Sequence, residues 1–334
     1  MPNIKDIARA AGVSPASVSR VINNGPKVGR ETRERIKQVM RDMGYSPNAN
    51  AQAINDQNNT SIGIVLADLV DPFFSAMAHG IEQVATLKNV QIFMNSGAFE
   101  RETELRAIET LLEHRYKAMV IHSSALEDNV LIGFARKVPG LVLINRYIDE
   151  IAERCVWLDD AMGGQLMADY ICSQGHSAIA IIDAPNNLSN STNRLSGALT
   201  FLKQRQLSPP IQLIEHAEAT YEGGRVAVQN LLASGIPFSA ILAHNDAMAI
   251  GAISMLDAQG INVPDDVSVI GFDDLMLARC IKPKLTTINN PIEEMAIKAT
   301  ELALANSQQH TGNQPRMAAF KPELVIRQSV KGLR

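Results

Sequence analysis

This 334-residue chain contains few aromatic residues, few cysteines and no long apolar run. Aromatic residues make up 4% of it, so we expect a core built mainly from aliphatic side chains. Cys155, Cys172 and Cys280 are an odd number without metal-binding spacing, which is typical of reduced cysteines in the cytoplasm. No apolar run approaches the roughly 18 residues of a membrane span, and no charged-then-apolar leader precedes Ile4. We therefore expect a cytoplasmic protein that is neither secreted nor membrane-spanning.

The signatures of enzymes, cofactor sites and metal sites are also missing. No glycine-rich phosphate-binding loop follows an expected strand. The seven histidines show no metal spacing, so we expect them to be structural or to lie on the surface. The paired carboxylates Asp159-Asp160 and Asp273-Asp274 are adjacent in the chain, and adjacent side chains rarely face one site. We expect no catalytic activity, no cofactor and no metal.

Charge is distributed unevenly along the chain. Residues 1–55 carry nine Lys and Arg against four Asp and Glu, a net charge of +5. The whole chain has a net charge of −4, so the remainder carries −9. A basic N-terminal segment on an acidic body indicates that only the former meets a polyanion such as DNA.

Two short helices joined by a tight turn are predicted at the N-terminus. Gly12 stands where the first helix has to stop, because glycine adopts a positive φ at little cost. Ser14 then caps the second helix, and Pro15 occupies its first position, where no backbone N–H is needed. The spacing of apolar residues predicts one buried stripe on each helix, formed by Ile4, Ile7, Ala8 and Ala11 and by Val18, Val21 and Ile22.

The outer face of the second helix is small and polar. Two helices held at an angle by apolar stripes, with such a face outward, form the plan of a DNA-reading helix-turn-helix. The alternative interpretation is an ordinary helical hairpin, because the helix–glycine–helix pattern alone fits both. A third helix is expected over Arg30–Met43, with Ile36, Val39, Met40 and Met43 facing inward and Tyr45 closing the core. The candidate DNA contacts of the head are Ser14, Pro15, Ala16, Ser19, Arg20 and Asn23.

From Ser61 onward, apolar strands alternate with helices, which predicts an α/β fold with two parallel sheets covered by helices on both faces. Expected strands span 62–67, 90–94, 118–122, 141–144, 156–158, 178–182, 240–243 and 267–270. Expected helices span 73–87, 102–114, 129–137, 161–173, 193–205, 222–233 and 246–259.

Polar and aromatic residues follow these strands, at the edge where open α/β sheets bind ligands. Carboxylates, amides and arginines take adjacent sugar hydroxyls in pairs, and aromatic rings cover the apolar face of a sugar. We expect only one of Asp273 and Asp274 to face the cleft, and Asp246 serves equally well as a helix cap. The candidates are Asp68, Asp71, Phe73, Phe74, Asn145, Arg146, Asp160, Arg194, Asn245, Asp246, Phe272, Asp273 and Asp274.

Several motifs together resemble the LacI/GalR family of bacterial repressors. They are the run Ile4–Asn24, the segments Arg30–Arg33 and Gly44-Tyr45, and the run Pro47–Ala51. The similarity continues to about Val330. Within the family, Val142–Arg146, Arg154-Cys155 and Leu158–Asp160 look most like the galactose repressors.

The resemblance implies a helix-turn-helix head at 1–46, a hinge segment at 47–60 and a body at 61–330. The body would have two doubly wound lobes of the periplasmic-binding-protein type, about 61–160 plus 290–319 and about 161–289 plus 320–330. Three strands would connect the lobes, the last two near Ile288–Asn290 and Met317–Lys321. Asn48, Ala51 and Ile54 of the hinge would enter the DNA minor groove. Ile54 stands where the family usually has Leu, and Gln52 where it often has Arg.

The function implied is that of a homodimeric repressor on double-stranded, inverted-repeat operator DNA, released by a small sugar bound between the lobes. D-galactose is the sugar expected, and another sugar or a nucleoside is the alternative. A sugar-binding receptor without a DNA role is the alternative from another class, which the basic head disfavours. The effector contacts implied are Phe73, Phe74, Asn145, Arg194, Asn245 and Asp273.

Overall fold

The computed structural model describes residues 2–22, 25–45, 61–185, 189–308 and 319–333. The chain divides into two compact units, Met1–Thr60 and Ser61–Arg334. We call them the head and the body and describe each by itself.

The head is a bundle of three helices, α1 (Ile4–Ala11), α2 (Pro15–Ile22) and α3 (Arg30–Asp42). Asn3 and Asp6 form a capping box at the start of α1, and Gly12 ends the helix with a φ of 66°. Tyr45 packs against the core, as predicted. The buried residues of this core are Ile7, Ala8, Ala11, Val18, Val21 and Ile36.

Two expected core residues of the head are exposed. Ile4 is 36% exposed and Met43 is 37% exposed, so the prediction that both face inward is wrong. Ile4 is the first residue of α1 and Met43 is the C-cap of α3, so both stand at helix ends. Gly29 precedes α3 without a side-chain hydrogen bond, as glycine must.

The first sheet of the body is parallel throughout and has the strand order β2-β1-β3-β4-β5. Ile62, Ile64 and Leu66 face one layer of helices and Val65 faces the other, which confirms helices on both faces. The strands are β1 (Ser61–Leu66), β2 (Gln91–Ser96), β3 (Ala118–Ile121), β4 (Gly140–Ile144) and β5 (Cys155–Val156). The covering helices are α5 (Pro72–Leu87), α6 (Arg101–Glu113), α7 (Asp128–Lys137) and α13 (Ile292–Ser307), with a 3-10 helix at Asp149–Arg154.

The second sheet has the order β11-β10-β9-β8-β6-β7 and is not wholly parallel, since β11 runs antiparallel to β10. Its strands are β6 (Ile179–Asp183), β7 (Ile214–His216), β8 (Ala240–Ala243), β9 (Ser268–Asp273), β10 (Thr286–Asn289) and β11 (Glu323–Val325). Its helices are α8 (Asp160–Ser173), α9 (Ser189–Gln204), α10 (Tyr221–Ala233), α11 (Asp246–Ala258) and α12 (Met276–Cys280), with a 3-10 turn at Ile211–Leu213.

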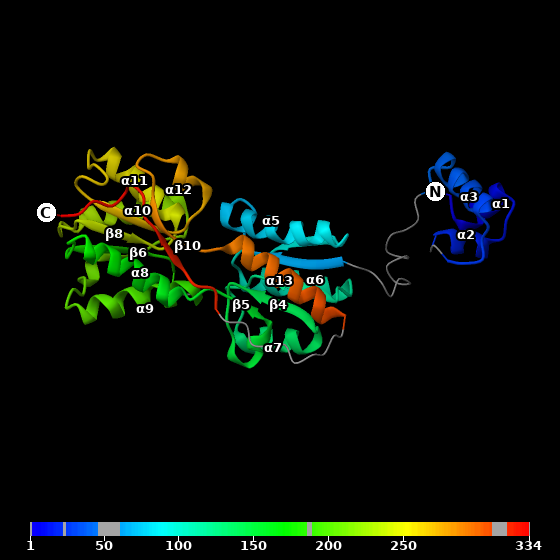
Figure 1. Ribbon diagram of the computed structural model, residues 1–334, viewed down its shortest axis with the longest axis horizontal. Helices are drawn as coiled ribbons and strands as arrows, with labels where there is room; N and C mark the ends of the chain where they lie inside the picture. Colours follow the sequence, from blue (N-terminus) through cyan, green and yellow to red (C-terminus); the bar gives the residue numbers. More distant parts are fainter. Residues whose placement is uncertain (1, 23–24, 46–60, 186–188, 309–318, 334) are drawn as a thin grey trace. The chain divides into compact units, whose positions relative to one another are not determined.

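The chain passes between the two lobes near Leu158, after β10 and near Phe320, where Leu158 and Phe320 form a β-bridge (Figure 1). The orange helix α13 lies beside α5 and the first sheet, although β10 before it belongs to the second sheet (Figure 1). Gly80 of α5 has the carbonyl of Glu293 at the place a Cβ would fill, so the two helices pack at backbone distance. Among the described residues, no helix is long and apolar enough to cross a membrane.

Candidate functional site

The head presents α2 as its candidate DNA-reading element. The Oγ of Ser14 accepts a hydrogen bond from the backbone N–H of Ser17 at 3.2 Å and lies 3.0 Å from the Ser17 hydroxyl, as an N-cap should. Val18 and Val21 anchor the inner face. Of the predicted DNA contacts, Ser14, Pro15, Ala16 and Arg20 are exposed and Ser19 is partly exposed.

The side chain of Arg20 makes no hydrogen bond or ion pair with any described residue, whereas its backbone carbonyl accepts a hydrogen bond from the Gly25 N–H at 2.7 Å. The turn after α2 is held to α3, because Arg33 Nη2 donates to the carbonyl of Gly25 at 2.8 Å. The helix is therefore fixed while its outer side chains remain available. Asn23 and the hinge residues Asn48, Ala51, Gln52 and Ile54 lie outside the described residues, and their roles stay predictions.

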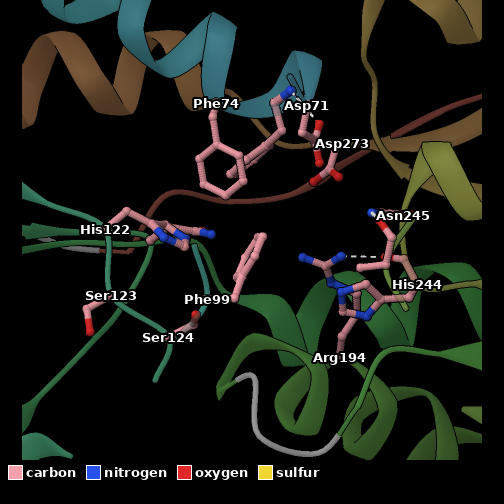
Figure 2. Close-up of a pocket in the computed structure, with 13 residues that line it drawn as sticks. Asp71, Phe74, Phe99, His122, Ser123, Ser124, Arg194, His244, Asn245 and Asp273 are labelled. Carbon is pink, nitrogen blue, oxygen red and sulfur yellow. Dashed lines mark hydrogen bonds between the residues drawn. The ribbon is translucent and has the colours of Figure 1, made fainter. Parts of the chain in front are cut away.

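The body contains a cavity between its two lobes, which we call the main cavity. It encloses about 610 Å³ including its open mouth. The structure brings all six residues predicted as effector contacts to this cavity, together with Asp71 (Figure 2). Its lining consists of Asp71, Phe73, Phe74, Phe99, His122, Ser123, Ser124, Asn145, Arg194, Ala219, His244, Asn245 and Asp273.

Two carboxylates lie side by side in the wall of the main cavity (Figure 2). Asp273 ends β9, is 8% exposed, and accepts a hydrogen bond from Asn290 Nδ2 at 3.1 Å. Burial raises the pKa of Asp273 to about 7, against the opposing effect of Arg194. Asp71 caps α5 through the backbone N–H of Phe73, and burial raises its pKa as well. Because the pKa of Asp273 lies near 7, this carboxyl group can donate a hydrogen bond when protonated and accept one when ionised near neutral pH.

Arg194 brings a guanidinium to the opposite wall, but its charge is already matched. Its Nε and Nη2 donate to Oδ1 of Asp160 at 3.1 and 2.7 Å, and Nη1 donates to the carbonyl of His244. The guanidinium also lies 3.4 Å from the ring centroid of Phe272, a cation–π contact. Asp160 is buried, and this burial raises its pKa despite the pull of Arg194. Asp160 and Phe272 thus hold Arg194 in place.

Asn245 and Asn145 come from different lobes, and their side-chain amides differ in how many hydrogen-bond partners they have within the protein. Asn245 caps α11, accepting from Met248 N–H at 2.8 Å and donating to the carbonyl of Ala219 at 3.0 Å. Most of its hydrogen-bonding capacity is therefore used within the protein. Asn145 has a positive φ of 60°, and its buried Oδ1 lacks a partner among the described residues. Buried polar atoms are rarely left unpaired, so the Oδ1 of Asn145 has unused capacity to accept a hydrogen bond.

Six of the lining residues were not among the candidates from the sequence, and they are Phe99, His122, Ser123, Ser124, Ala219 and His244. Sequence reasoning placed no histidine at this cavity. Burial lowers the pKa of His122 to about 4, so its ring is neutral at pH 7. His122 and Ser123 directly follow β3 and His244 follows β8. These three residues therefore follow the carboxyl ends of strands, and the preference of ligands for that edge of a sheet would have identified them from the sequence.

A buried carboxylate holds the loop that carries two of these residues. Glu104 of α6 is fully buried, and it accepts hydrogen bonds from the Ser123 hydroxyl at 2.5 Å and the Ser124 N–H at 3.1 Å. The N–H of Ala125 also donates to it at 3.2 Å. A polar loop is fixed by this carboxylate against the mouth of the main cavity.

The remaining candidates have structural roles. Asp246 is fully buried and accepts hydrogen bonds from Thr287 Oγ1 at 2.6 Å and from Leu275 N–H at 2.8 Å, so it ties α11 to the second sheet. Asp274 pairs with Arg327 and Arg279, which leaves Asp273 as the one that faces the main cavity, as predicted. Arg146 turns away to Asp128.

The comparisons with known proteins agree with this division of the chain. Residues 3–48 match the model described as "Bacterial regulatory proteins, lacI family", and residues 168–330 match "Periplasmic binding protein-like domain". The HTH-type transcriptional regulator GalR of Escherichia coli K12 is 39% identical over 99% of this chain and 96% of its own length. GalS of Salmonella typhimurium LT2 is 38% identical over 99% of this chain and 97% of its own length. A crystal structure of the lac repressor dimer bound to operator and the anti-inducer ONPF superposes with a TM-score of 0.83 at 26% identity, covering 99% of both chains.

Proposed function

This chain belongs to the LacI family of bacterial regulatory proteins, and from that premise we propose that its effector is a neutral sugar, D-galactose, bound in the main cavity. The protein is a DNA-binding transcriptional repressor with a sugar-binding domain, and it is not an enzyme. We assign it to the cytoplasm. The proposed boundaries are 1–46 for the head, 47–60 for the hinge and 61–330 for the body. Lobe one comprises about 61–160 plus 290–319, and lobe two about 161–289 plus 320–330.

The DNA half of the proposal concerns α2 and the hinge. A homodimer places two copies of α2 in successive major grooves, so its operator is an inverted repeat. The related lac repressor is a dimer on operator DNA. We assign base and groove contacts to Ser14, Pro15, Ala16, Ser19, Arg20 and Asn23 in the head and to Asn48, Ala51 and Ile54 in the hinge.

The observation that carries the sugar half is that Asp273 from lobe two and Asn145 from lobe one both line the main cavity. Both side chains are buried, and the Oδ1 of Asn145 lacks a described partner. The charge of Arg194 is neutralised by Asp160, which disfavours a phosphorylated sugar and favours a neutral polyol. Phe73, Phe74 and Phe99 supply apolar surface for the C–H face of the ring. The kinship with GalR supports galactose.

A sugar that bridges Asp273 and Asn145 holds the lobes in one arrangement. The equilibrium between two lobe arrangements then shifts by the difference in affinity of the sugar for the two. Operator DNA prefers the other arrangement, so the sugar releases the repressor. Repression and induction are therefore two populations of one protein.

Asp273→Ala tests the proposal. A hydrogen bond to a charged group contributes about 1.5–3 kcal/mol, so losing two such bonds lowers sugar affinity by at least roughly a hundredfold. We expect the variant to bind operator normally and to ignore galactose in a gel-shift titration. Asp169→Ala, on the exposed face of α8, is the matched control and keeps the wild-type response. If galactose released Asp273→Ala from the operator at the concentrations that release the wild type, the sugar pocket would lie elsewhere. If a nucleoside stabilised the wild-type protein and galactose did not, the nucleoside alternative would be favoured.

A further inference from the structure

The amino ends of the strands in the first sheet form a surface that we call the basic edge. Because these strands are parallel, the connections from α5 to β2, from α6 to β3 and from α7 to β4 meet at one edge, opposite the carboxyl ends that line the main cavity. The last two residues of each helix and the connection that follows it contain one acidic residue, Glu113, and five basic ones. The five are Lys88, Arg115, Lys117, Arg136 and Lys137.

The positive charge of the basic edge is not neutralised within the described part of the body. All five basic side chains are exposed, and none of them makes an ion pair or a side-chain hydrogen bond with another described residue. Lys137 Nζ approaches only the ring of Phe134, at 5.8 Å from its centroid. A neighbouring acid, Glu153, already pairs with Arg154 at 3.6 Å. The basic edge is therefore open to an anion from outside the chain.

The second lobe has the same order of helices and strands without this charge. Its four connections before β6, β7, β8 and β9, counted in the same way, contain two basic and three acidic residues. One of the two basic residues, Arg205, lies 3.7 Å from Asp169. A cation near a helix C-terminus is favourable because of the helix dipole. The second lobe shows that such connections fold without a surplus of cations, so the helix dipole does not account for the basic edge.

Arg115 occupies a backbone position that suits arginine poorly. Its φ is 59°, in the left-handed region that favours glycine, and the turn is held because the Tyr116 N–H donates to the carbonyl of Leu111 at 3.1 Å. At the same position after α5 stands Asn89 with a φ of 53°, and asparagine tolerates this conformation. Arginine in such a turn costs stability, and a strained residue of this kind points to a role outside folding.

An aromatic contact fixes the connection that carries Arg115 and Lys117. The ring of Tyr116, which lies between them in the sequence, stacks on Phe93 of β2 with 5.6 Å between centroids and 21° between planes. The backbone that carries the two cations is therefore ordered before any anion arrives. Ordering in advance lowers the entropy that binding has to overcome.

We propose that the basic edge is a second DNA-contacting surface, which binds the phosphate backbone of operator DNA. Phosphate contacts require exposed cations and carry no sequence information. The head is joined to the body at this edge, because Ser61 begins β1 and pairs in register with Gln91, the first residue of β2. The net charge of −9 after residue 55 indicates that only the head meets a polyanion, but that total averages over an edge of the opposite sign.

The triple variant Lys88→Gln, Arg115→Asn and Lys117→Gln, the edge variant, tests this proposal without touching α2 or the main cavity. We would measure its affinity for operator duplex at increasing salt. Each lost phosphate contact lowers the slope of log K against log salt by about 0.9, so losing one in each subunit of the dimer shrinks the advantage of the wild type about tenfold between about 50 and about 200 mM salt. Asparagine suits the turn at position 115, so we expect this variant to melt no lower than the wild type.

The control variant Lys203→Gln, Lys282→Gln and Lys284→Gln removes the same charge from exposed positions of the second lobe and should keep the wild-type slope. The edge variant should lose affinity equally for operator and random duplex, unlike Arg20→Ala, because phosphates are the same in both. A wild-type slope in the edge variant overturns the proposal. An equal fall in the control variant also overturns it, because net charge alone would then explain the effect.

Lysine acylation read by mass spectrometry tests the contact directly in the full chain. Saturating operator duplex should protect Lys88, Lys117 and Lys137 from acetic anhydride and leave Lys203 and Lys284 as reactive as in the free protein. Lysines of the basic edge that remain fully reactive on operator overturn the proposal, even where the edge variant binds more weakly.

Discussion

At the scale of single residues, we expect Asp273 to make the response to sugar depend on pH. Burial raises its pKa from 3.8 to about 7, so between those values the folded protein holds a proton that the unfolded chain has lost. Its contribution to the free energy of unfolding is therefore present at low pH and is lost as pH rises towards 7. Sugar hydroxyls donate to the ionised carboxylate and favour that form. Sugar binding should accordingly release a proton near neutral pH.

We therefore expect galactose affinity to rise between pH 6 and pH 8, by at most about tenfold per pH unit below the pKa. Calorimetry in buffers of different ionisation enthalpy measures both the affinity and the proton released. Asp273→Asn should bind weakly and without this dependence. Persistence of the full pH dependence in that variant would assign it to Asp71, whose pKa is also raised by burial. Equal wild-type affinity at pH 6 and pH 8 would contradict the prediction.

Residues at strand ends could be predicted from the sequence, because the carboxyl edge of a parallel sheet is fixed by topology. This reasoning found Asn145, Asn245 and Asp273. The direction of a side chain at that edge depends on local turns, so the sequence left open whether Asp246 faces the ligand. Phe99 could not be found in this way, because it reaches the main cavity from a positive-φ turn after β2.

At the scale of elements, we expect the exposed face of α2 to carry sequence selectivity. Arg20 can reach a guanine edge in the major groove, and such a contact contributes about 1–3 kcal/mol of discrimination. We expect Arg20→Ala to lose most of its preference for operator over random DNA and to keep weak, salt-sensitive binding. Competition gel shifts measure this ratio. Arg41→Ala, at the exposed end of α3, removes the same charge from the head and should keep the ratio. An equal loss of affinity for operator and for random DNA would mean that Arg20 contacts only the phosphate backbone.

Elements with caps and a clear apolar period were placed within a few residues, as α1, α2 and α5 illustrate. The helix α13 was not predicted, because it is rich in small apolar residues and is buried on several sides, which erases the amphipathic period. The strand β7 has only three residues at the edge of its sheet and is too short to give a pattern. Strand β9 runs three residues past its predicted end, through Asp273, because β10 pairs with it there.

At the scale of the whole molecule, the sequence indicated a basic DNA-reading head and an acidic sugar-binding body. The division between Thr60 and Ser61 agrees with two changes along the sequence, from a basic to an acidic net charge and to alternating strands and helices. The body has two lobes joined by three crossings, so a ligand between them can change the arrangement of the lobes only through those crossings. Sugar and operator are then linked by one coupling free energy, whatever path the coupling takes through the chain.

This linkage has a reciprocal consequence that can be measured. If saturating galactose weakens operator binding by some factor, saturating operator must weaken galactose binding by the same factor, typically about 5–150-fold. We would measure operator affinity with and without galactose, and galactose affinity with and without an excess of operator duplex. A random duplex of equal length is the control, and it should change galactose affinity far less, because it does not select the repressing arrangement. Saturating galactose that leaves operator affinity unchanged, or that weakens operator and random duplex equally, would contradict the proposal that operator and sugar prefer different lobe arrangements.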